Sequence, residues 1–363
     1  MAGDRIVSLQ VLRFFAAAAV IVMHIVGPWR WTIMGHEPGF HWTMLGAAGV
    51  DVFFVLSGFV IATTGPLAEH RPTGAAFFFR RFTRVAPLFW LLSLPFIAAA
   101  AWVGHLNWPQ TAATLFWPVA SGVARPPYLE PGWTLCFEMA FYTAVSLLLV
   151  GRRLKRNLIL GAVILVALLA VRLTTGLSAA RYLTSPTFLE FGLGVALAML
   201  RRHLVRLAPL IGVALLLIGL SIYGFEAANR LGPYVTWPVS VEGAAAMQRF
   251  VLLGLPASLI VAGGLISDRA WRGPLMRFLA YLGDASYSIY LAGNIVSDFL
   301  LIAWIRTLGV HRPILMTAVI ALLAIATGVA CYRWIERPIL RDVRRFAPKP
   351  RAAPSVLPAV AVD

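Results

Sequence analysis

The sequence contains little charge and very little acid. Of its 363 residues 13% are charged, and 31 lysines and arginines stand against 15 aspartates and glutamates. A soluble globular domain carries about 25% charged residues, so this composition argues against a water-soluble globule. A basic excess is also typical of nucleic-acid-binding proteins. Here the positive side chains cluster in short connections between apolar runs, which is the pattern of a membrane protein. We therefore expect no nucleic-acid partner.

Cysteine is also scarce, and neither cysteine supports a site. Cys136 and Cys331 both lie in apolar segments. They provide no disulfide framework and no metal-ligand spacing. We interpret both as small buried apolar residues and predict no metal site. The sequence also shows no internal repeat and no soluble second domain.

Apolar runs of near-spanning length fill most of the chain, which is 60% hydrophobic. A helix needs about 20 apolar residues to cross a bilayer, and isolated spans are helical because lipid offers the backbone no hydrogen bonds. The sequence predicts an all-α protein, a polytopic membrane bundle of about ten transmembrane helices. The expected spans are residues 6–27, 44–65, 85–104, 134–150, 158–174, 184–200, 207–224, 248–266, 285–305 and 313–335.

The distribution of basic residues predicts the topology. They concentrate in alternate connections and after the last span, and this positive-inside pattern places both termini in the cytoplasm. Residues 1–345 then form one membrane-embedded domain, and the Pro- and Ala-rich residues 346–363 form a disordered cytoplasmic tail. The first run could instead be a secretory signal. Because Arg13 interrupts it and no small-x-small cleavage site follows His24, we expect an uncleaved helix.

The first predicted helix carries two ionisable side chains. Arg13 and His24 are the ends of RFFAAAAVIVMH, so they share a helix face and lie roughly 16 Å apart along the axis. Ionisable residues within a span are costly and mark functional sites. We interpret His24 as a base within the membrane and Arg13 as an anion anchor on the cytoplasmic side.

Six acidic residues fall within or beside the predicted spans. Such residues face the bundle interior, pair with one another or line a path, and six are more than a purely structural bundle needs. They are Asp51, Glu138, Glu190, Asp284, Asp298 and Glu336.

Asp51 and Glu138 are the two acids nearest to a catalytic interpretation. Asp51 either accepts a hydrogen bond from the His24 imidazole and fixes its tautomer, or caps the start of the second span. Glu138 orients the histidine, binds the acceptor or pairs with an arginine, and Tyr142 shares its helix face. The sequence leaves these alternatives open.

Two further groups have structural interpretations near the C-terminus. Asp284 and Ser286 in LGDASYSIYLAGN resemble a helix start. Arg333 and Glu336 in YRWIERP are three residues apart and can pair as a latch within the last helix.

The segment FRRFTRVAP at 79–87 carries a cationic cluster at the predicted entrance of the third span. Arg81 and Arg84 share a helix face, and Arg80 adds a third guanidinium, a group that binds phosphate bidentately. Topology-setting charge alone would explain the cluster. Taken with Arg13 on the same side, the cluster makes phosphate binding plausible.

Aromatic residues gather in the outer connections 105–133 and 225–247. Tryptophan and tyrosine there form an interfacial belt, or they stack on sugar rings. The candidate substrate-contacting residues are Trp133, Tyr142 and Tyr290, and Tyr290 either lines the site with Tyr287 or anchors its helix.

Six motifs occur in order: Arg-x10-His, GVDVFFVLSGFVIA, RRFTRVAPLFW, GWTLCFEMAFY, LGDASYSIYL and RWIERP. Together they resemble the integral-membrane acyltransferase family 3, and within it the stand-alone O-acyltransferases of bacterial exopolysaccharide and lipopolysaccharide. The resemblance runs from about residue 5 to 340.

The resemblance implies transfer of an acyl group, often acetyl, from cytoplasmic acyl-CoA to a hydroxyl of an extracytoplasmic glycan, at the bacterial inner membrane. Acyl-CoA is then a donor substrate, and no cofactor stays bound. Many members have a histidine where this chain has Gly293, which implies an altered acceptor, reliance on His24 alone or loss of activity. The other motifs are intact, which weighs against the loss of activity. The family's motif residues correspond here to Arg13, His24, Asp51, Arg81, Arg84 and Glu138.

The mechanism expected from this resemblance holds the donor phosphates on Arg13, Arg81 and Arg84. His24 acts as general base on the acceptor hydroxyl, with Asp51 or Glu138 holding it. A transporter or flippase would also place ionisable residues on a path through the membrane. The absence of a half-to-half repeat weighs against that alternative.

Overall fold

The computed structural model describes residues 6–34, 42–68, 71–116, 127–150, 184–229, 243–309 and 312–345, with a few positions between 156 and 170. Every regular element in these ranges is helical, which confirms the predicted all-α class. The tail after residue 345 and most of the span predicted at 158–174 lie outside the described residues.

The described helices have the following order along the chain. They are α1 (Val7–Met34), α2 (Trp42–Thr64), α3 (Gly74–Trp102), α4 (Trp108–Phe116), α5 (Gly132–Leu148), α8 (Phe188–Leu204), α9 (Pro209–Asn229), α10 (Gly243–Arg249), α11 (Leu255–Ser267), α12 (Pro274–Asp284), α13 (Ser286–Ser288), α14 (Asn294–Leu308), α15 (Pro313–Cys331) and α16 (Arg337–Arg344). A 3-10 turn η4 (Asp268–Ala270) and three π-helical turns, η3 (Phe250–Gly254), η5 (Ile289–Gly293) and η6 (Tyr332–Glu336), join neighbouring helices. Such π-turns are frequent at functional sites.

Seven helical segments in the described part of the chain are long and apolar enough to cross a bilayer, and α5 is a shorter apolar helix. The chain is therefore a multi-pass membrane protein, whereas the count of ten spans stays a prediction. The seven segments are Val7–Val26, Gly46–Thr64, Gly74–Trp102, Pro209–Ala228, Ala245–Ala270, Ser286–Leu308 and Ile314–Val343.

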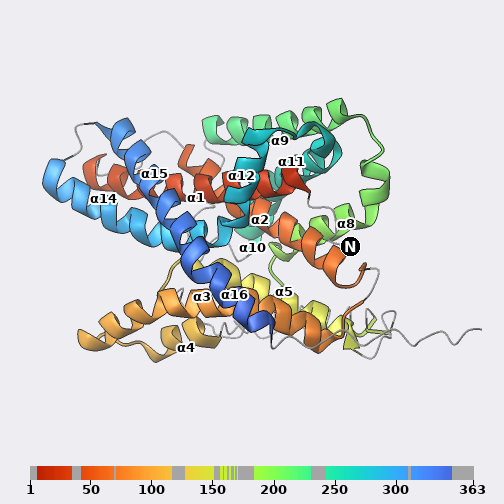
Figure 1. Cartoon of the computed structure of the whole chain (residues 1–363), viewed down its shortest axis with the longest axis horizontal. Helices are drawn as coiled ribbons and strands as arrows, with labels where there is room; N and C mark the ends of the chain where they lie inside the picture. Colours follow the sequence, from red (N-terminus) through yellow and green to blue (C-terminus); the bar gives the residue numbers. More distant parts are fainter. Residues whose placement is uncertain are drawn as a thin grey trace, which may run out of the picture.

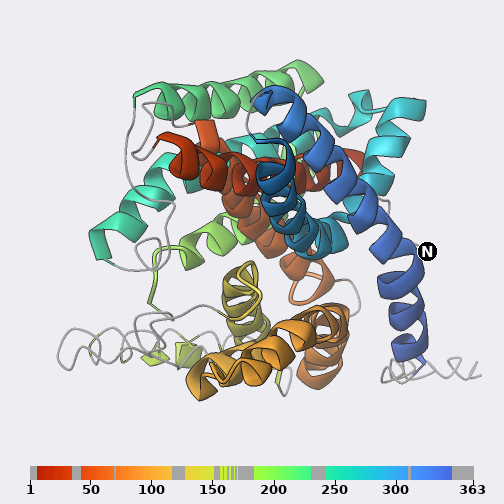
Figure 2. The same cartoon turned by 90° about the vertical axis from the view of Figure 1, so that its left-hand side faces the viewer.

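The helices form a main body with a smaller group beside it. Figure 1 shows α3, α4 and α5 together on one side of the molecule, α9 on the opposite side, and α1 and α2 between them. In Figure 2, α15, η6 and α16 run as one rod from the main body towards α3, and α16 contacts α3. The candidate site lies between the two groups.

Helix α2 is the central element of the main body, with α1 and α8 packed on it. The approach of α2 and α8 requires glycine on both helices. A Cβ atom at Gly58 would lie 2.1 Å from the Phe191 carbonyl oxygen, and one at Gly194 would lie 2.0 Å from that of Val55. Small residues at such contacts let two membrane helices pack backbone against backbone.

A buried ion pair joins α2 to α10. The Nε and Nη2 atoms of Arg249 donate to the two Asp51 carboxylate oxygens at 3.0 and 2.8 Å. The two side chains are only 2% and 0% exposed. A bidentate guanidinium satisfies both oxygens of a buried carboxylate, whereas one imidazole N–H satisfies one.

This pair corrects both predictions for Asp51. Helix α2 begins at Trp42, nine residues before Asp51, so Asp51 does not cap it. The carboxylate is bound by Arg249 and not by His24.

The predicted ion pair between Arg333 and Glu336 in the last helix is also wrong. Glu336 is buried and accepts a hydrogen bond from the Ser288 hydroxyl at 2.6 Å, while Arg333 is exposed. The cause is the π-turn η6, which widens the helix at 332–336 and removes the three-residue spacing argument. The helix start predicted at 284–286 is confirmed only for Ser286, since Asp284 ends α12.

Replacing Arg249 by alanine is expected to destabilise the protein by about 3–5 kcal/mol, because it leaves the Asp51 carboxylate buried without its counter-charge. Thermal unfolding of the detergent-purified protein should show a lowered midpoint. The matched control is Arg345→Ala, which removes an exposed Arg345–Asp342 pair at 3.6 Å and should cost about 0–1 kcal/mol. Equal midpoints for the two variants would contradict the prediction.

Candidate active site

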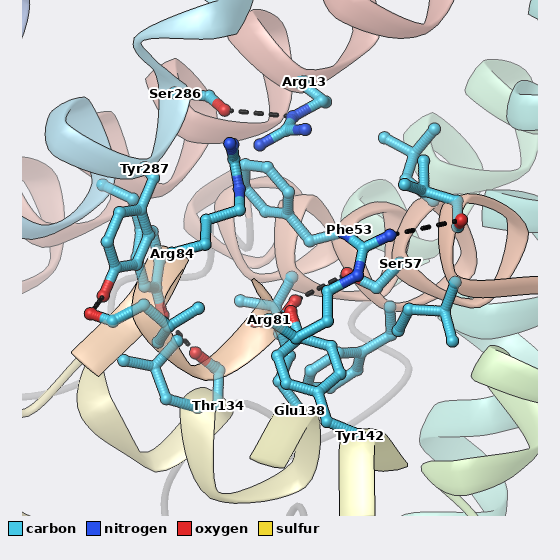
Figure 3. A pocket seen from close by; sticks show the side chains of 18 residues that line it. Arg13, Phe53, Ser57, Arg81, Arg84, Thr134, Glu138, Tyr142, Ser286 and Tyr287 are labelled. Atoms are coloured by element: carbon cyan, nitrogen blue, oxygen red, sulfur yellow. Dashed lines mark hydrogen bonds between the residues drawn. The ribbon is translucent and has the colours of Figure 1, made fainter. Parts of the chain in front are cut away.

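A pocket lies where α3 and α5 face α1, α2 and α13 (Figure 3). Its walls combine apolar side chains, most of them from α2, with polar groups from five helices and from η5. The polar lining residues are Arg13, Ser57, Arg81, Arg84, Thr134, Glu138, Tyr142, Ser286, Tyr287 and Tyr290. An apolar cleft with a few convergent polar groups is the usual form of a small-molecule site.

Three arginines enter this pocket from two helices. The Nε atom of Arg13 donates to the Ser286 hydroxyl at 3.1 Å, and Arg81 donates to the Val60 carbonyl oxygen at 3.5 Å and to the Thr64 hydroxyl. Arg84 extends towards Arg13 in Figure 3 and donates no hydrogen bond among the described residues.

Arg81 and Arg84 lie on one helix, as predicted. That helix, α3, begins at Gly74 and thus earlier than the span predicted at 85–104. The Thr73 hydroxyl caps this start by accepting from the Ala76 N–H. Both arginines are therefore held by helix geometry and not by a loop.

The charges around the pocket do not cancel. Arg13 lies within electrostatic range of Arg84, Glu138 and Glu336, and Arg81 lies within range of Glu138. With both glutamates ionised, the three guanidinium groups leave an excess positive charge. Guanidinium groups bind phosphate and carboxylate through paired N–H donors, so the arrangement suits an anionic ligand.

A second pocket adjoins the first and shares Arg81 and Arg84 with it. Arg80 is exposed and lines only this second pocket, while α16 contributes Leu340 and Val343. The two pockets therefore meet at Arg81 and Arg84, and the second one extends to α16.

Glu138 lies in the inner pocket with two hydroxyl donors. The Ser57 hydroxyl donates to its Oε1 atom at 2.6 Å, and the Tyr142 hydroxyl donates to Oε2 at 3.2 Å. Tyr142 is one turn after Glu138 on α5, as the sequence predicts, and Ser57 reaches it from α2. The carboxylate is thus fixed at both oxygens (Figure 3).

Tyr290 and Thr134 join η5 to the start of α5. The Tyr290 hydroxyl donates to the Pro131 carbonyl oxygen at 3.1 Å and lies 3.1 Å from the Thr134 hydroxyl. Tyr290 is buried and lines the pocket, so it occupies the position predicted for a substrate residue. Its hydroxyl is engaged by the protein.

His24 is half-buried on α1 but does not line this pocket. Its electrostatic partner is Asp298 on α14, which also lies within range of Glu130. Arg13 and His24 therefore lie in different surroundings. Arg13 lines the pocket, and His24 lies beside α14.

Two other predicted residues also lie outside the pocket. Asp51 is bound to Arg249, and Trp133 packs edge-on against Phe54 and Phe137. The Arg249 guanidinium lies 5.9 Å from the centre of the Trp133 ring. Arg249 escaped sequence reasoning because it stands in none of the motifs, and the buried charge of Asp51 was the single signal for it.

The family comparison now decides the class of protein. The family model described as "Acyltransferase domain" matches residues 6–333, which is most of the chain. The chain belongs to acyltransferase family 3. It is therefore a membrane acyltransferase, as the order of its motifs predicts.

Three relatives illustrate the similarity. The acyltransferase is 31% identical to "Exopolysaccharide production protein ExoZ" of Rhizobium meliloti (strain 1021), over 85% of this chain and 93% of the relative. It is 27% identical to "Putative membrane-bound transacylase BcsY" of Komagataeibacter xylinus, over 85% and 79%. It is 32% identical to "Acyltransferase MdmB" of Streptomyces mycarofaciens over 39% of each chain. No solved structure matches the acyltransferase.

Position 293, where the family resemblance implies a histidine in many members, has little room for a side chain. A Cβ atom at Gly293 would lie 2.8 Å from Ile21 Cδ1 and 3.2 Å from the Ala324 carbonyl oxygen. Ile21 precedes His24 by three residues on α1. The glycine thus lets α1 approach η5 and sets the position of His24.

Gly293→Ala is expected to displace α1 and to lower acyl transfer by up to about 10²-fold, since small displacements of a reacting group are costly. Product formation by purified variants is the measurement. The controls are Gly192→Ala and Gly224→Ala, where no atom lies within 4 Å of the added Cβ. Activity of Gly293→Ala equal to that of the controls would refute the packing argument.

Proposed function

We propose that this acyltransferase moves an acyl group, with acetyl as the default, from cytoplasmic acyl-CoA to a hydroxyl of a glycan beyond a bacterial inner membrane. The name of the Rhizobium meliloti relative, an exopolysaccharide production protein, supports a glycan acceptor. The similarity to this relative extends over 93% of its length and 85% of this chain.

The observation that carries the proposal is the convergence of Arg13, Arg81 and Arg84 on one pocket. Acyl-CoA presents several phosphates on a nucleotide and a thioester at the end of a long arm. Arg80, Arg81 and Arg84 bind the phosphates at the pocket beside α16, on the side where both termini are expected. The arm then passes Arg13 and reaches the apolar walls of the inner pocket.

The acceptor hydroxyl approaches from the His24 end of α1. His24 removes the proton from that hydroxyl, and a neighbouring carboxylate stabilises the imidazolium that forms. The candidate carboxylate is Asp298, which interacts electrostatically with His24. It takes the place of Asp51, which the sequence suggested and which binds Arg249. Arg13 and His24 are about 16 Å apart along the helix, so donor phosphates and acceptor occupy opposite ends of one site.

Arg84→Ala is expected to raise the acetyl-CoA concentration needed for half-maximal binding by about tenfold or more, because a charge-assisted contact to phosphate contributes roughly 1.5–3 kcal/mol. Binding of labelled acetyl-CoA to the detergent-purified protein measures this. Arg202→Ala, at an exposed position on α8, is the control. Unchanged binding in Arg84→Ala would remove Arg84 from the donor site.

His24→Ala is expected to lower glycan acylation by at least about 10²-fold, the usual contribution of a general base. Acetyl-CoA binding and thermal stability should stay at wild-type values, since His24 does not line the arginine pocket. The assay follows labelled acetyl groups onto the host's surface glycan. Near-normal acylation by this variant would overturn the assignment of the base.

Proteoliposomes that contain the acyltransferase, labelled acetyl-CoA and the glycan separate this proposal from the transporter alternative. Label that appears on the glycan supports acyl transfer. Glycan that crosses the bilayer without label supports transport and contradicts the proposal.

A further inference from the structure

Three aliphatic hydroxyls line the inner pocket, and their hydrogen bonds differ. The Ser286 hydroxyl accepts from Arg13, and the Thr134 hydroxyl donates to the Pro131 carbonyl oxygen at 2.9 Å. Ser57 donates to a carboxylate, that of Glu138, at 2.6 Å. Among these three, Ser57 is the one whose hydroxyl donates its hydrogen bond to a carboxylate, a group that can act as a base.

The base is itself held by a third group. Tyr142 donates to the other oxygen of Glu138, which leaves Oε1 directed at Ser57. A nucleophile within hydrogen-bond reach of a base that is oriented by a third side chain is the recurring arrangement of covalent catalysis. Here the three residues come from α2 and α5, and they lie inside the apolar pocket (Figure 3).

The backbone that carries Ser57 is rigid. Its neighbour Gly58 is in contact with the backbone of α8, where even a methyl group would meet the Phe191 carbonyl oxygen. A reacting group needs a fixed position to within a fraction of an ångström. Packing of α2 on α8 fixes the helix behind Ser57 and directs the hydroxyl into the pocket.

Ser57 lies on the donor side of the site. The arginines and Ser57 line the same pocket, whereas His24 lies outside it, beside α14. Thr134 and Tyr290 belong to the wall of the pocket, and both donate to the Pro131 carbonyl oxygen. A donor thioester in this pocket meets Ser57 and Glu138.

We propose that Ser57 is the nucleophile of a covalent acyl relay, with Glu138 as its base and Tyr142 as the residue that orients Glu138. This inference rests on the proposed acyl-CoA donor and goes beyond it. The acyl group is held on the protein between release of CoA and arrival of the acceptor.

The chemistry balances in two steps. In the first, Glu138 takes the Ser57 proton, Oγ attacks the thioester carbonyl carbon, the C–S bond breaks, and CoA leaves as a thiolate that gains a proton from water. In the second, the acceptor oxygen attacks the ester while His24 takes its proton and later releases it to water. Glu138 returns its proton to Ser57.

The test uses the purified full-length acyltransferase with acetyl-CoA labelled in the acetyl group and no glycan. After an acid quench, peptide mapping by mass spectrometry should find one acetyl group on Ser57, with release of one equivalent of CoA. Added glycan should remove that acetyl group and become labelled. Glu138→Gln should slow acetylation of Ser57 by at least about 10²-fold.

Four variants keep the proposal falsifiable. Ser57→Ala should lose both the protein-bound label and glycan acylation while still binding a non-hydrolysable thioether analogue of acetyl-CoA. Ser57→Cys should still accept the acetyl group, now as a thioester that neutral hydroxylamine cleaves. Tyr142→Phe should slow acetylation of Ser57 without removing it. Ser146→Ala is the matched control, because it too removes a serine hydroxyl that bonds to a neighbouring helix. The Ser146 hydroxyl on α5 donates to the Gly74 carbonyl oxygen of α3, and Ser146 does not line the pocket.

The outcomes separate this inference from the proposed function. Normal glycan acylation by Ser57→Ala, or label on the peptide that contains His24, would overturn the relay and leave the proposed function intact. Wild-type protein that labels neither itself nor the glycan would overturn the proposed function as well.

Discussion

A charge buried away from water must find a partner, and this requirement organises the acyltransferase. Asp51 is fully buried and is bound by two nitrogen atoms of Arg249, a residue almost two hundred positions later in the chain. Because neither side chain is stable alone in such a place, the pair ties α10 to α2. The packing of α8 on α2 through glycine then completes a rigid centre.

The same requirement identifies the part of the molecule that awaits a ligand. Around the inner pocket three guanidinium groups, those of Arg13, Arg81 and Arg84, face two carboxylates, those of Glu138 and Glu336. Arg84 donates no hydrogen bond among the described residues. A structural ion-pair network would be balanced. An excess of guanidinium groups beside apolar walls is what a long donor with a phosphorylated head requires.

Helix α2 connects these two regions, because neighbouring residues of one motif contact different helices. Asp51 faces α10, Gly58 faces α8, and Ser57 faces the pocket and Glu138. The motif GVDVFFVLSGFVIA therefore combines an ion pair, a helix contact and a candidate nucleophile within two turns of one helix. A substitution on one face is transmitted to the others, since the helix moves as a unit.

The sequence by itself determined the helical class, the membrane character, the family and the identity of most pocket residues. Apolar runs allow only helices in lipid, and Arg13, Arg81, Arg84, Glu138 and Tyr142 stand in recognisable motifs. Spacing on one helix also predicted the Glu138–Tyr142 contact, because residues four apart share a face. Only the tertiary structure decided which residues meet across helices. In the folded protein Asp51 pairs with Arg249, and Glu138 and Glu336 accept hydrogen bonds from Ser57 and Ser288. His24 interacts electrostatically with Asp298. Local periodicity fixes which face a side chain occupies, whereas its partner depends on how helices distant in the chain pack, and that packing has no local signal.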